Sequence, residues 1–482
     1  MNIVITMRIL GLLLMLFSIT MMPSILISAF YKDGAHLAFI TGMSITFFTG
    51  FFTWLPVRRE RKELRTRDGF LVVVLFWTVL SLFGSIPLFL TETPDLSFTD
   101  AVFESVSGLS TTGATVITGL DELPKSILFY RQLLQWLGGM GIIVLAVAIL
   151  PMLGIGGMQL YRAEIPGPVK DNKLTPRITE TAKALWYIYL TLTLLCAGAY
   201  WIAGMSLFDA VSHSFSTVAI GGFSTHDASI RYFDSAAIES IGIVFMLIST
   251  VNFSLHFLAW RERSVRNYFY DPEFKFFLFL MTLTSVSTIG VLWLTSTYSF
   301  ADSFRNGLFE VVSVATTTGF GVADFSQWPS VLPFTLFLAA FVGGCAGSTG
   351  GGMKVIRVLL ILKQGLREVK RLIHPSAVIP VKVGGRSVPD RVIEAVWGFF
   401  SVYMMLFVVM LIGLLATGLD QVTAWSAVGS ALNNLGPGLG DVAAHYGNIP
   451  DIAKWILIVA MLLGRLEIFT LLVLFTPMFW RR

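Results

Sequence analysis

One stretch of the chain decides its fold: Phe98-Thr-Asp-Ala-Val-Phe-Glu-Ser-Val-Ser-Gly-Leu-Ser-Thr-Thr-Gly113-Ala-Thr115. It begins as a short amphipathic helix and ends in hydroxyl side chains around a glycine. The pattern recurs along the chain, because each of four glycines has a serine six residues before it: Gly113, Gly222, Gly319 and Gly436. Internal repetition of this kind predicts repeated structural units, here four of them.

Each copy of the pattern lies between two long apolar segments, so that a short helix and a loop fall between two membrane-spanning helices. Non-helical backbone at membrane depth occurs only where it is buried in protein or lines a water-filled cavity. Four such loops around one axis would form a ring of backbone carbonyls, which is how a potassium filter replaces the hydration shell of an ion. The alternative is four re-entrant loops that only pack the helix bundle.

The composition places the chain in the membrane. Of 482 residues, 55% are hydrophobic and only 13% are charged, and the mean hydropathy is +0.75. Many apolar runs reach the length of about 18–20 residues that a spanning helix needs. Cys196 and Cys345 lie in apolar or glycine-rich context and indicate neither a disulfide framework nor a metal site. Basic runs between spans are orientation signals and not nucleic-acid patches.

We therefore predict an all-α polytopic membrane protein with four repeated span–pore-helix–span units around a pseudo-fourfold ion pore. An N-terminal two-helix transmembrane hairpin precedes them. The second helix of the third unit is expected to be the only broken one, and Ser235–Trp260 and Asp451–Trp480 are each expected to be a single span. The predicted divisions are residues 1–57 for the hairpin and 68–160, 178–265, 272–372 and 388–482 for the units.

Charge distribution predicts the orientation. Most of the 34 Lys and Arg residues fall in alternate loops, and the positive-inside rule makes that side cytoplasmic. Both termini are then cytoplasmic. Few basic residues fall on the side of the pore loops: Lys32, Lys125, Arg131, Arg231, Arg305 and Lys454.

Three residues of each loop are the candidate ion-binding filter. Because carbonyl oxygens coordinate the ion, their side chains can vary, whereas the glycine reaches positive φ without steric cost and is needed. This variation predicts a loose filter that also passes Rb⁺ and some Na⁺. The filter residues are Thr111, Thr112, Gly113, Ile220, Gly221, Gly222, Thr317, Thr318, Gly319, Asn434, Leu435 and Gly436.

A glycine-rich run interrupts the second helix of the third unit at residues 343–352. Its glycine spacing resembles a phosphate-binding loop, but Met353 stands where that motif needs lysine and no strand precedes it. We expect a gate just cytoplasmic of the filter; the alternative is a close-packing patch of small residues. The gate residues are Gly343, Gly344, Gly347, Ser348, Thr349, Gly350, Gly351 and Gly352.

Three charged residues at membrane depth are further candidates. Arg465 lies mid-way along the last predicted span, where a charge is expensive and usually faces a cavity or a partner. It is a barrier to cations below the filter, structural glue with a carboxylate such as Glu467 or a pore-helix glutamate, or both. Glu104 and Glu310 stand nine residues before their glycines. We expect them to support filter backbone; direct ligation of the ion is the alternative.

These features together resemble the bacterial Trk/Ktr/HKT superfamily of potassium transporters. The resemblance covers the whole chain, and the N-terminal hairpin Ile3–Leu55 is similar to the Trk branch. It implies a potassium-uptake subunit of the bacterial inner membrane, a homodimer, with K⁺ as its bound ion. It also implies a cytosolic TrkA-type nucleotide-binding ring that regulates it, and a loop at Gly343–Gly352 that obstructs the pore.

Other classes fit less well. An inverted-repeat transporter would have units of opposite topology and broken helices in both halves. A membrane enzyme would need a clustered acid, base, nucleophile or metal set, and the sequence has none, so we expect no enzymatic activity. Passive inward flow of K⁺ would be driven by the membrane potential. The alternative that the sequence leaves open is a proton- or Na⁺-coupled K⁺ symporter.

Overall fold

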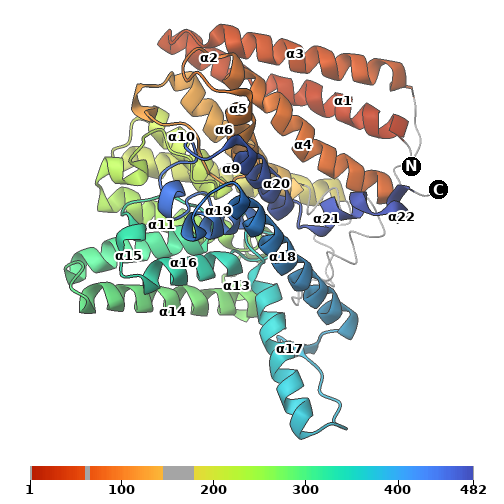
Figure 1. Cartoon of the computed structure of the whole chain (residues 1–482), viewed down its shortest axis with the longest axis vertical. Coiled ribbons are helices and arrows are strands. Elements are labelled where there is room, and N and C mark those ends of the chain that lie inside the picture. The colour runs from red at the N-terminus through yellow and green to blue at the C-terminus, as the bar shows by residue number, and fades with distance from the viewer. Residues whose placement is uncertain (1–2, 60–65, 145–177, 481–482) are drawn as a thin grey trace.

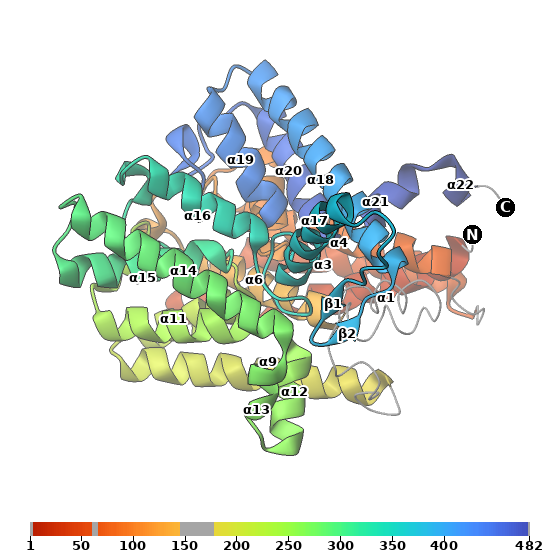
Figure 2. The same ribbon diagram turned by 90° about the horizontal axis from the view of Figure 1, so that it is seen from below.

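The described residues fold into a bundle of helices with one short β-hairpin (Figure 1 and Figure 2). The computed structural model describes residues 3–59, 66–144 and 178–480. Within these residues six helices are long and apolar enough to cross a membrane, or up to eight if each bent pair is counted as one span. The prediction of an all-α polytopic membrane fold is confirmed.

The N-terminal hairpin packs against the first unit. It comprises α1 (Ile3–Ile19), α2 (Met22–Tyr31), α3 (His36–Trp54) and the 3₁₀ turn η1 (Leu55–Val57). Gly11 of α1 and Gly50 of α3 allow close approach, because a Cβ on either would lie 2.7 Å from the carbonyl oxygen of the other. Both α1 and α3 contact α4 (Figure 1).

Four sets of three helices follow, and in each set the short middle helix packs against both neighbours. The pattern of an apolar span, a short amphipathic helix and a second span therefore folds as the sequence predicts, although the limits of the units stay predictions. The sets are α4 (Thr66–Leu90), α5 (Phe98–Leu109) and α6 (Lys125–Val144); α9 (Ile178–Ile202), α10 (Leu207–Ala219) and α11 (Ala236–Thr250); α14 (Pro272–Leu294), α15 (Phe300–Ala315) and α16 (Val331–Val342); and α18 (Asp390–Ala416), α19 (Gln421–Asn433) and α20 (Asp451–Arg465).

The short helices begin at side-chain caps. Ser97, Ser206 and Ser299 each accept a hydrogen bond from the backbone N–H three residues later, and Asp420 takes this role for α19. An aspartate in the first turn of α5, α10 and α15 favours the positive end of the helix dipole. These caps fix the residue at which each pore helix starts.

The expectation that only the third unit has a broken second helix is wrong. α11 turns by 93° into α12 (Phe253–Glu262), and α20 turns by 107° into the segment that comprises α21 (Phe469–Leu472) and η8 (Val473–Phe475). Asn252 causes the first break, because its side chain caps α12 by accepting from the N–H of Ser254. The second break has positive φ values at Glu467 and Ile468. Neither break contains the Gly or Pro that would signal it.

The third unit has the break that was predicted. After α16 the chain forms a buried loop and continues as α17 (Val355–Ile373), which projects from the bundle (Figure 1). Beside α17 lies the hairpin of β1 (Lys382–Val383) and β2 (Arg386–Ser387), which pair antiparallel (Figure 2). The remaining elements are α13 (Arg266–Tyr270), α22 (Pro477–Trp480), η2 (Leu120–Glu122), η5 (Ser229–Phe233), η6 (Phe325–Gln327) and η7 (Gly440–Val442).

The largest apolar core joins the hairpin, the first unit and the fourth unit around residues such as Trp77, Phe103 and Leu457. The start of α1 and the whole of α22 lie on the same side of the bundle (Figure 1). The expected second span of the first unit, to Leu150, continues past the end of α6 into residues outside those described.

Candidate ion pore

All four loops leave their pore helix by the same turn. The residue two before each glycine has a left-handed φ, between 53° and 66°, and the glycine itself has a φ between 77° and 102°. The N–H of the residue between them donates to the carbonyl of the serine six residues before the glycine, at 2.8–2.9 Å. The repeated offset in the sequence therefore marks one hydrogen-bonded turn, made in turn by Ser107, Ser216, Ser313 and Ser430.

The four turns close into a ring. A Cβ added to Gly113 would lie under 3.0 Å from the carbonyl oxygen of Gly221 in the second loop. The same holds for Gly222 against Thr318, for Gly319 against Leu435 and for Gly436 against Thr112. Each glycine thus faces the carbonyl of the next loop in chain order, and the fourth faces the first. The structure brings together the predicted filter residues in a pseudo-fourfold arrangement, while their binding of an ion stays a prediction.

Filter side chains are buried behind the ring. Asn434 donates from Nδ2 to Thr112 Oγ1 at 2.9 Å and to the carbonyl of Met461 at 3.0 Å, which joins the fourth loop to the first. Ile220 and Leu435 are almost completely buried in apolar surroundings. Because the side chains contact protein, their chemical variation does not change the carbonyl ring.

The two glutamates hold the backbone that follows the filter. Glu310 accepts from the N–H groups of Val322 and Ala323 at 2.7 and 2.9 Å. Glu104 accepts from the N–H of Val116 at 3.0 Å and forms an ion pair with Arg131 at 2.7 Å. Each carboxylate accepts from the N–H of the residue three positions after the filter glycine of its unit, which is the contact expected of a support for the filter backbone. Both side chains are at most 1% exposed.

Sequence reasoning missed two further supports. His213 stands nine residues before Gly222, where the first and third units have glutamate, and its Nε2 lies 2.9 Å from Ser224 Oγ. The common offset was the signal that could have found it. Gln135 of α6 donates to the carbonyl of Gly221 at 2.6 Å and accepts from the N–H of Phe223 at 3.1 Å. The repeated sequence pattern does not include Gln135, because this residue lies on the second span of the first unit and its partners lie in the loop of the second.

A cavity of about 480 Å³ lies over one face of the ring and is lined by all four glycines. On the other face the space is only about 40 Å³ and is lined by Gly350, Gly351, Gly352 and Arg465. The larger cavity is also lined by residues of the loops that follow the filter. The glycine-rich loop therefore borders a much smaller space than the loops that follow the filter do.

A histidine joins two of the loops beside the wide cavity. His226 hydrogen-bonds through Nδ1 to Asp121 of the first unit, its Nε2 lies 3.5 Å from Asp209, and its ring stacks on Tyr232. Burial disfavours the charged imidazole, but the nearby carboxylates of Asp209 and Asp121 outweigh it and raise the pKa of His226 above 6.5. Because the folded-state pKa is raised, this contribution to stability is complete below pH 6.5 and is lost as the pH rises through the higher value.

The glycine-rich loop is tied to α10, α11 and α19 and to the filter residue Thr317. Thr349 donates to the carbonyls of Val218 and Ser249, both at 3.1 Å. The N–H of Gly351 donates to Thr317 Oγ1 at 2.7 Å, and the N–H of Gly352 donates to the carbonyl of Asn433 at 3.1 Å. The predicted gate residues therefore lie directly beneath the filter, although their opening stays a prediction.

The loop is also anchored at its two ends. Glu273, at the start of α14, accepts from the N–H groups of Ala346 at 2.7 Å and Ile356 at 3.3 Å. The ammonium of Lys354 donates to the carbonyl of Gly350. These contacts use backbone groups that the broken helix leaves without helical partners.

Arg465 is the last residue of α20, at the 107° bend, and not mid-way along a span as predicted. It is 7% exposed, and its Nη1 donates to the carbonyl of Thr349 at 3.3 Å. Among the described ion pairs it has no carboxylate partner, and Glu467 pairs with Arg357 at 2.8 Å. Its Nε and Nη2 have no hydrogen-bond partner in the described part of the chain. The charge thus lies against the glycine-rich loop, while its role as barrier or as glue stays a prediction.

The ring offers carbonyl oxygens to a monovalent cation and little to a transition metal. No group of three or more His, Cys, Asp or Glu residues that could hold a metal ion occurs in residues 3–59, 66–144 and 178–480. The C-terminal ends of α10 and α19 meet at the loop beneath the ring, and Thr317 follows the end of α15. Helix C-termini carry partial negative charge and stabilise a cation.

Comparison with known proteins agrees with this geometry. The sequence model of TrkH, described as a cation transport protein, matches residues 35–482. The Trk system potassium uptake protein TrkH of Halomonas elongata is 69% identical over 476 residues, 98% of each chain. The TrkH of Escherichia coli K12 is 57% identical over 476 residues, again 98% of each. The crystal structure of the potassium transporter TrkH from Vibrio parahaemolyticus superposes with a TM-score of 0.93 at 57% identity over 100% of both chains.

Proposed function

Because the chain belongs to the TrkH family of cation transport proteins, we propose that it takes up K⁺ through the ring of filter carbonyls. The observation that carries this proposal is the closure of the ring, in which each filter glycine faces the carbonyl of the next loop. Four oxygen atoms at one level replace part of the hydration shell of a potassium ion. Rb⁺ and, less readily, Na⁺ follow the same path.

The route needs no chemical energy. Moving one charge inward is favoured by about 2.3 kcal/mol for each 100 mV of membrane potential. The wide cavity collects ions from the side of the pore loops, and the buried helix ends lower the cost of dehydration at the ring. Transport is then channel-like, and a proton- or Na⁺-coupled symporter is the alternative that flux measurements would reveal.

The gate is the loop at residues 343–352. It closes the narrow side through its bonds to Val218, Thr317 and Asn433, and opening breaks these bonds. Arg465 adds a positive charge at the same level and raises the barrier to a cation until the loop moves. The loop and Arg465 both lie beneath the ring, so that ions from the wide cavity reach the filter before the gate.

The protein acts as a multi-pass subunit of the bacterial inner membrane with both termini in the cytoplasm. Arginines and lysines concentrate on the side of α17 and the α12–α13 segment, which supports this orientation. We expect a homodimer, regulated by a cytosolic TrkA-type nucleotide-binding ring that contacts this face. The projecting α17 connects that face directly to the gate loop.

The test is a flux measurement on the purified protein in liposomes. A negative interior potential is imposed and ⁸⁶Rb⁺ uptake is recorded with K⁺, Na⁺ or Li⁺ as competitors. Uptake that K⁺ abolishes, Na⁺ reduces and Li⁺ leaves unchanged supports the channel-like filter. Uptake that begins only when a proton or Na⁺ gradient is supplied contradicts passive conduction and supports the symporter.

A further inference from the structure

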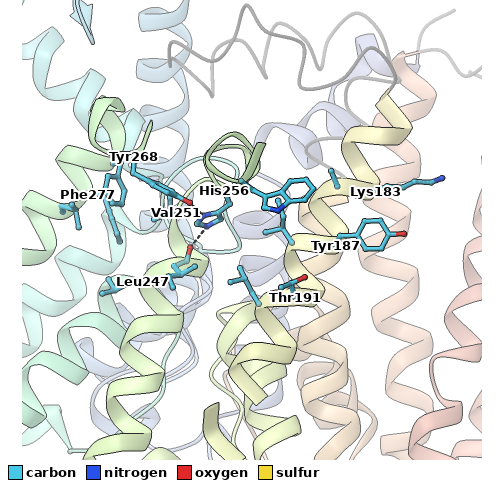
Figure 3. Close-up of a pocket in the computed structure, with 15 residues that line it drawn as sticks. Lys183, Tyr187, Thr191, Leu247, Val251, His256, Tyr268 and Phe277 are labelled. Carbon is cyan, nitrogen blue, oxygen red and sulfur yellow. Dashed lines mark hydrogen bonds between the residues drawn. The ribbon is translucent and has the colours of Figure 1, made fainter. Parts of the chain in front are cut away.

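Away from the pore, an apolar cavity of about 870 Å³ lies under the bend between α11 and α12 (Figure 3). Because α12 turns aside by 93°, the space that a straight helix would fill is left open. Its wall combines Leu247 of α11 and Val251 of the turn after it with Phe277 of α14 and Thr191 of α9. A cavity of this volume is within the range of small-ligand sites.

The wall suits a hydrocarbon chain. Its single imidazole, His256, is satisfied on both nitrogens: Nε2 donates to the carbonyl of Ile248 at 2.9 Å and Nδ1 accepts from the hydroxyl of Tyr268 at 2.7 Å. The carbonyl has no proton to give, so it fixes this tautomer. With these polar atoms paired, most of the remaining lining is aliphatic or aromatic. A polar solute would gain few hydrogen bonds there.

One lysine and one tryptophan are among the residues that line the cavity, and more basic residues follow Trp260 in the chain. Lys183 lies at the start of the described lining on α9, and Figure 3 shows its amine directed away from the aromatic side chains. Exposed arginines at positions 261, 263 and 266 occupy the α12–α13 segment together with Trp260, which is 73% exposed. Aromatic and basic side chains together are typical of a membrane interface that contains anionic headgroups.

The same bend holds the gate loop. The carbonyl of Thr250 accepts from the N–H of Cys345 at 3.1 Å, and the N–H of Phe253 donates to the carbonyl of Gly347 at 3.0 Å. Leu247, Ile248 and Val251 line the cavity within a few residues of these bonds. Whatever fills the cavity therefore packs against the segment that positions the gate.

We propose that this cavity is a regulatory site for an anionic phospholipid. One acyl chain occupies the space under the bend, and the headgroup phosphate lies against Lys183 and the arginines of the α12–α13 segment. Occupancy braces the bend and holds the gate loop in its closed position. The proposal that a lipid binds here does not depend on transport, whereas the proposal that the lipid regulates the gate rests on the proposed function.

Binding is tested by photo-crosslinking. The full-length protein is placed in phosphatidylcholine nanodiscs with a trace of phosphatidylglycerol that carries a diazirine in one acyl chain, and labelled peptides are mapped by mass spectrometry. We expect label on the peptides that contain Leu247, Val251 and Phe277. Unlabelled phosphatidylglycerol should compete, and added phosphatidylcholine should not.

Two variants sharpen the result. Thr191→Trp fills the cavity from α9 and should reduce this label about tenfold, whereas Ile412→Trp, on the exposed face of α18, should leave it unchanged. Lys183→Gln removes one charge at the rim and should weaken competition by phosphatidylglycerol about fivefold. Equal labelling by a phosphatidylcholine probe, even labelling of α18, or no effect of Thr191→Trp would overturn the site. So would crosslinks between two copies through this face.

Regulation is tested by Rb⁺ flux in liposomes of phosphatidylcholine with and without phosphatidylglycerol. Phosphatidylglycerol should lower the flux of the wild type and of Ile412→Trp severalfold and leave that of Thr191→Trp unchanged. Equal sensitivity of all three would overturn the coupling to the gate. A protein that conducts in no liposome would contradict the proposed function, while the crosslinking result still decides the site.

Discussion

Replacing Gly113 with alanine tests whether the carbonyl ring determines selectivity. The added Cβ would lie 2.0 Å from the carbonyl oxygen of Gly221, whereas real Cβ atoms essentially never approach within 3.0 Å. That carbonyl must therefore move by about 1 Å. Gln135 resists the shift, because its amide holds the same oxygen at 2.6 Å.

The expected effect is on ion discrimination. A misplacement of about 1 Å at a functional group commonly costs on the order of 100-fold in enzymes. Here one carbonyl of four moves, so we expect the preference for K⁺ over Na⁺ to fall about tenfold, which corresponds to about 1.4 kcal/mol. The left-handed backbone at Gly113, with φ of 82°, adds a strain of about 1–2 kcal/mol to folding.

Gly119→Ala is the matched control. Gly119 has a φ of 71° in the same segment, but a Cβ there meets nothing within 4 Å. It should lower the free energy of unfolding by about the same 1–2 kcal/mol of left-handed strain as Gly113→Ala does, and leave selectivity unchanged. Competition of ⁸⁶Rb⁺ uptake by K⁺ and Na⁺ in liposomes measures discrimination, and thermal unfolding measures stability. Equal selectivity in wild type, Gly113→Ala and Gly119→Ala would refute the reasoning.

Three other changes concern Arg465, the filter support Glu310 and His226 beside the wide cavity. Arg465→Ala should raise Rb⁺ flux at least about tenfold, because a like charge a few Å from the ion costs several kcal/mol; a melting temperature lowered with no gain in flux would indicate glue. Glu310→Ala leaves two buried N–H groups unpaired and should cost about 1–3 kcal/mol for each in thermal unfolding. Glu310→Gln keeps an acceptor and should cost less, so an equal loss would count against the support role. As the pH on the side of the pore loops rises from 6.5 through the raised pKa of His226, the wild type should lose thermal stability. His226→Gln should remove that part of the pH dependence, and an unchanged profile would exclude the tie to Asp121 and Asp209.

The filter was predictable because its geometry repeats. One turn with a left-handed residue, a glycine and a serine carbonyl at a fixed offset occurs four times. The four copies within one chain could therefore be compared with one another. Glu104 and Glu310 followed from the same offset. The order of the ring was not predictable, since the contact of each glycine with the next loop joins residues about a hundred positions apart.

The breaks in α11 and α20 were not predictable from composition. Asn252 caps α12 by a local side-chain bond, and Glu467 and Ile468 take positive φ values that their residue types rarely adopt. Tertiary contacts stabilise both breaks. Glu467 pairs with Arg357 at the second, and the N–H of Phe253 donates to the carbonyl of Gly347 at the first. The position of Arg465 depends on the second break, and for that reason the sequence placed it within a continuous span.

The most direct test of the central claim is to locate the ion. Crystals of the protein grown with Rb⁺ in place of K⁺ are measured at the rubidium absorption edge. The account predicts an anomalous peak on the axis of the ring, within coordination distance of the carbonyls of Thr112, Gly221, Thr318 and Leu435. A fully occupied Rb⁺ site elsewhere in the protein, with none at the ring, would contradict it.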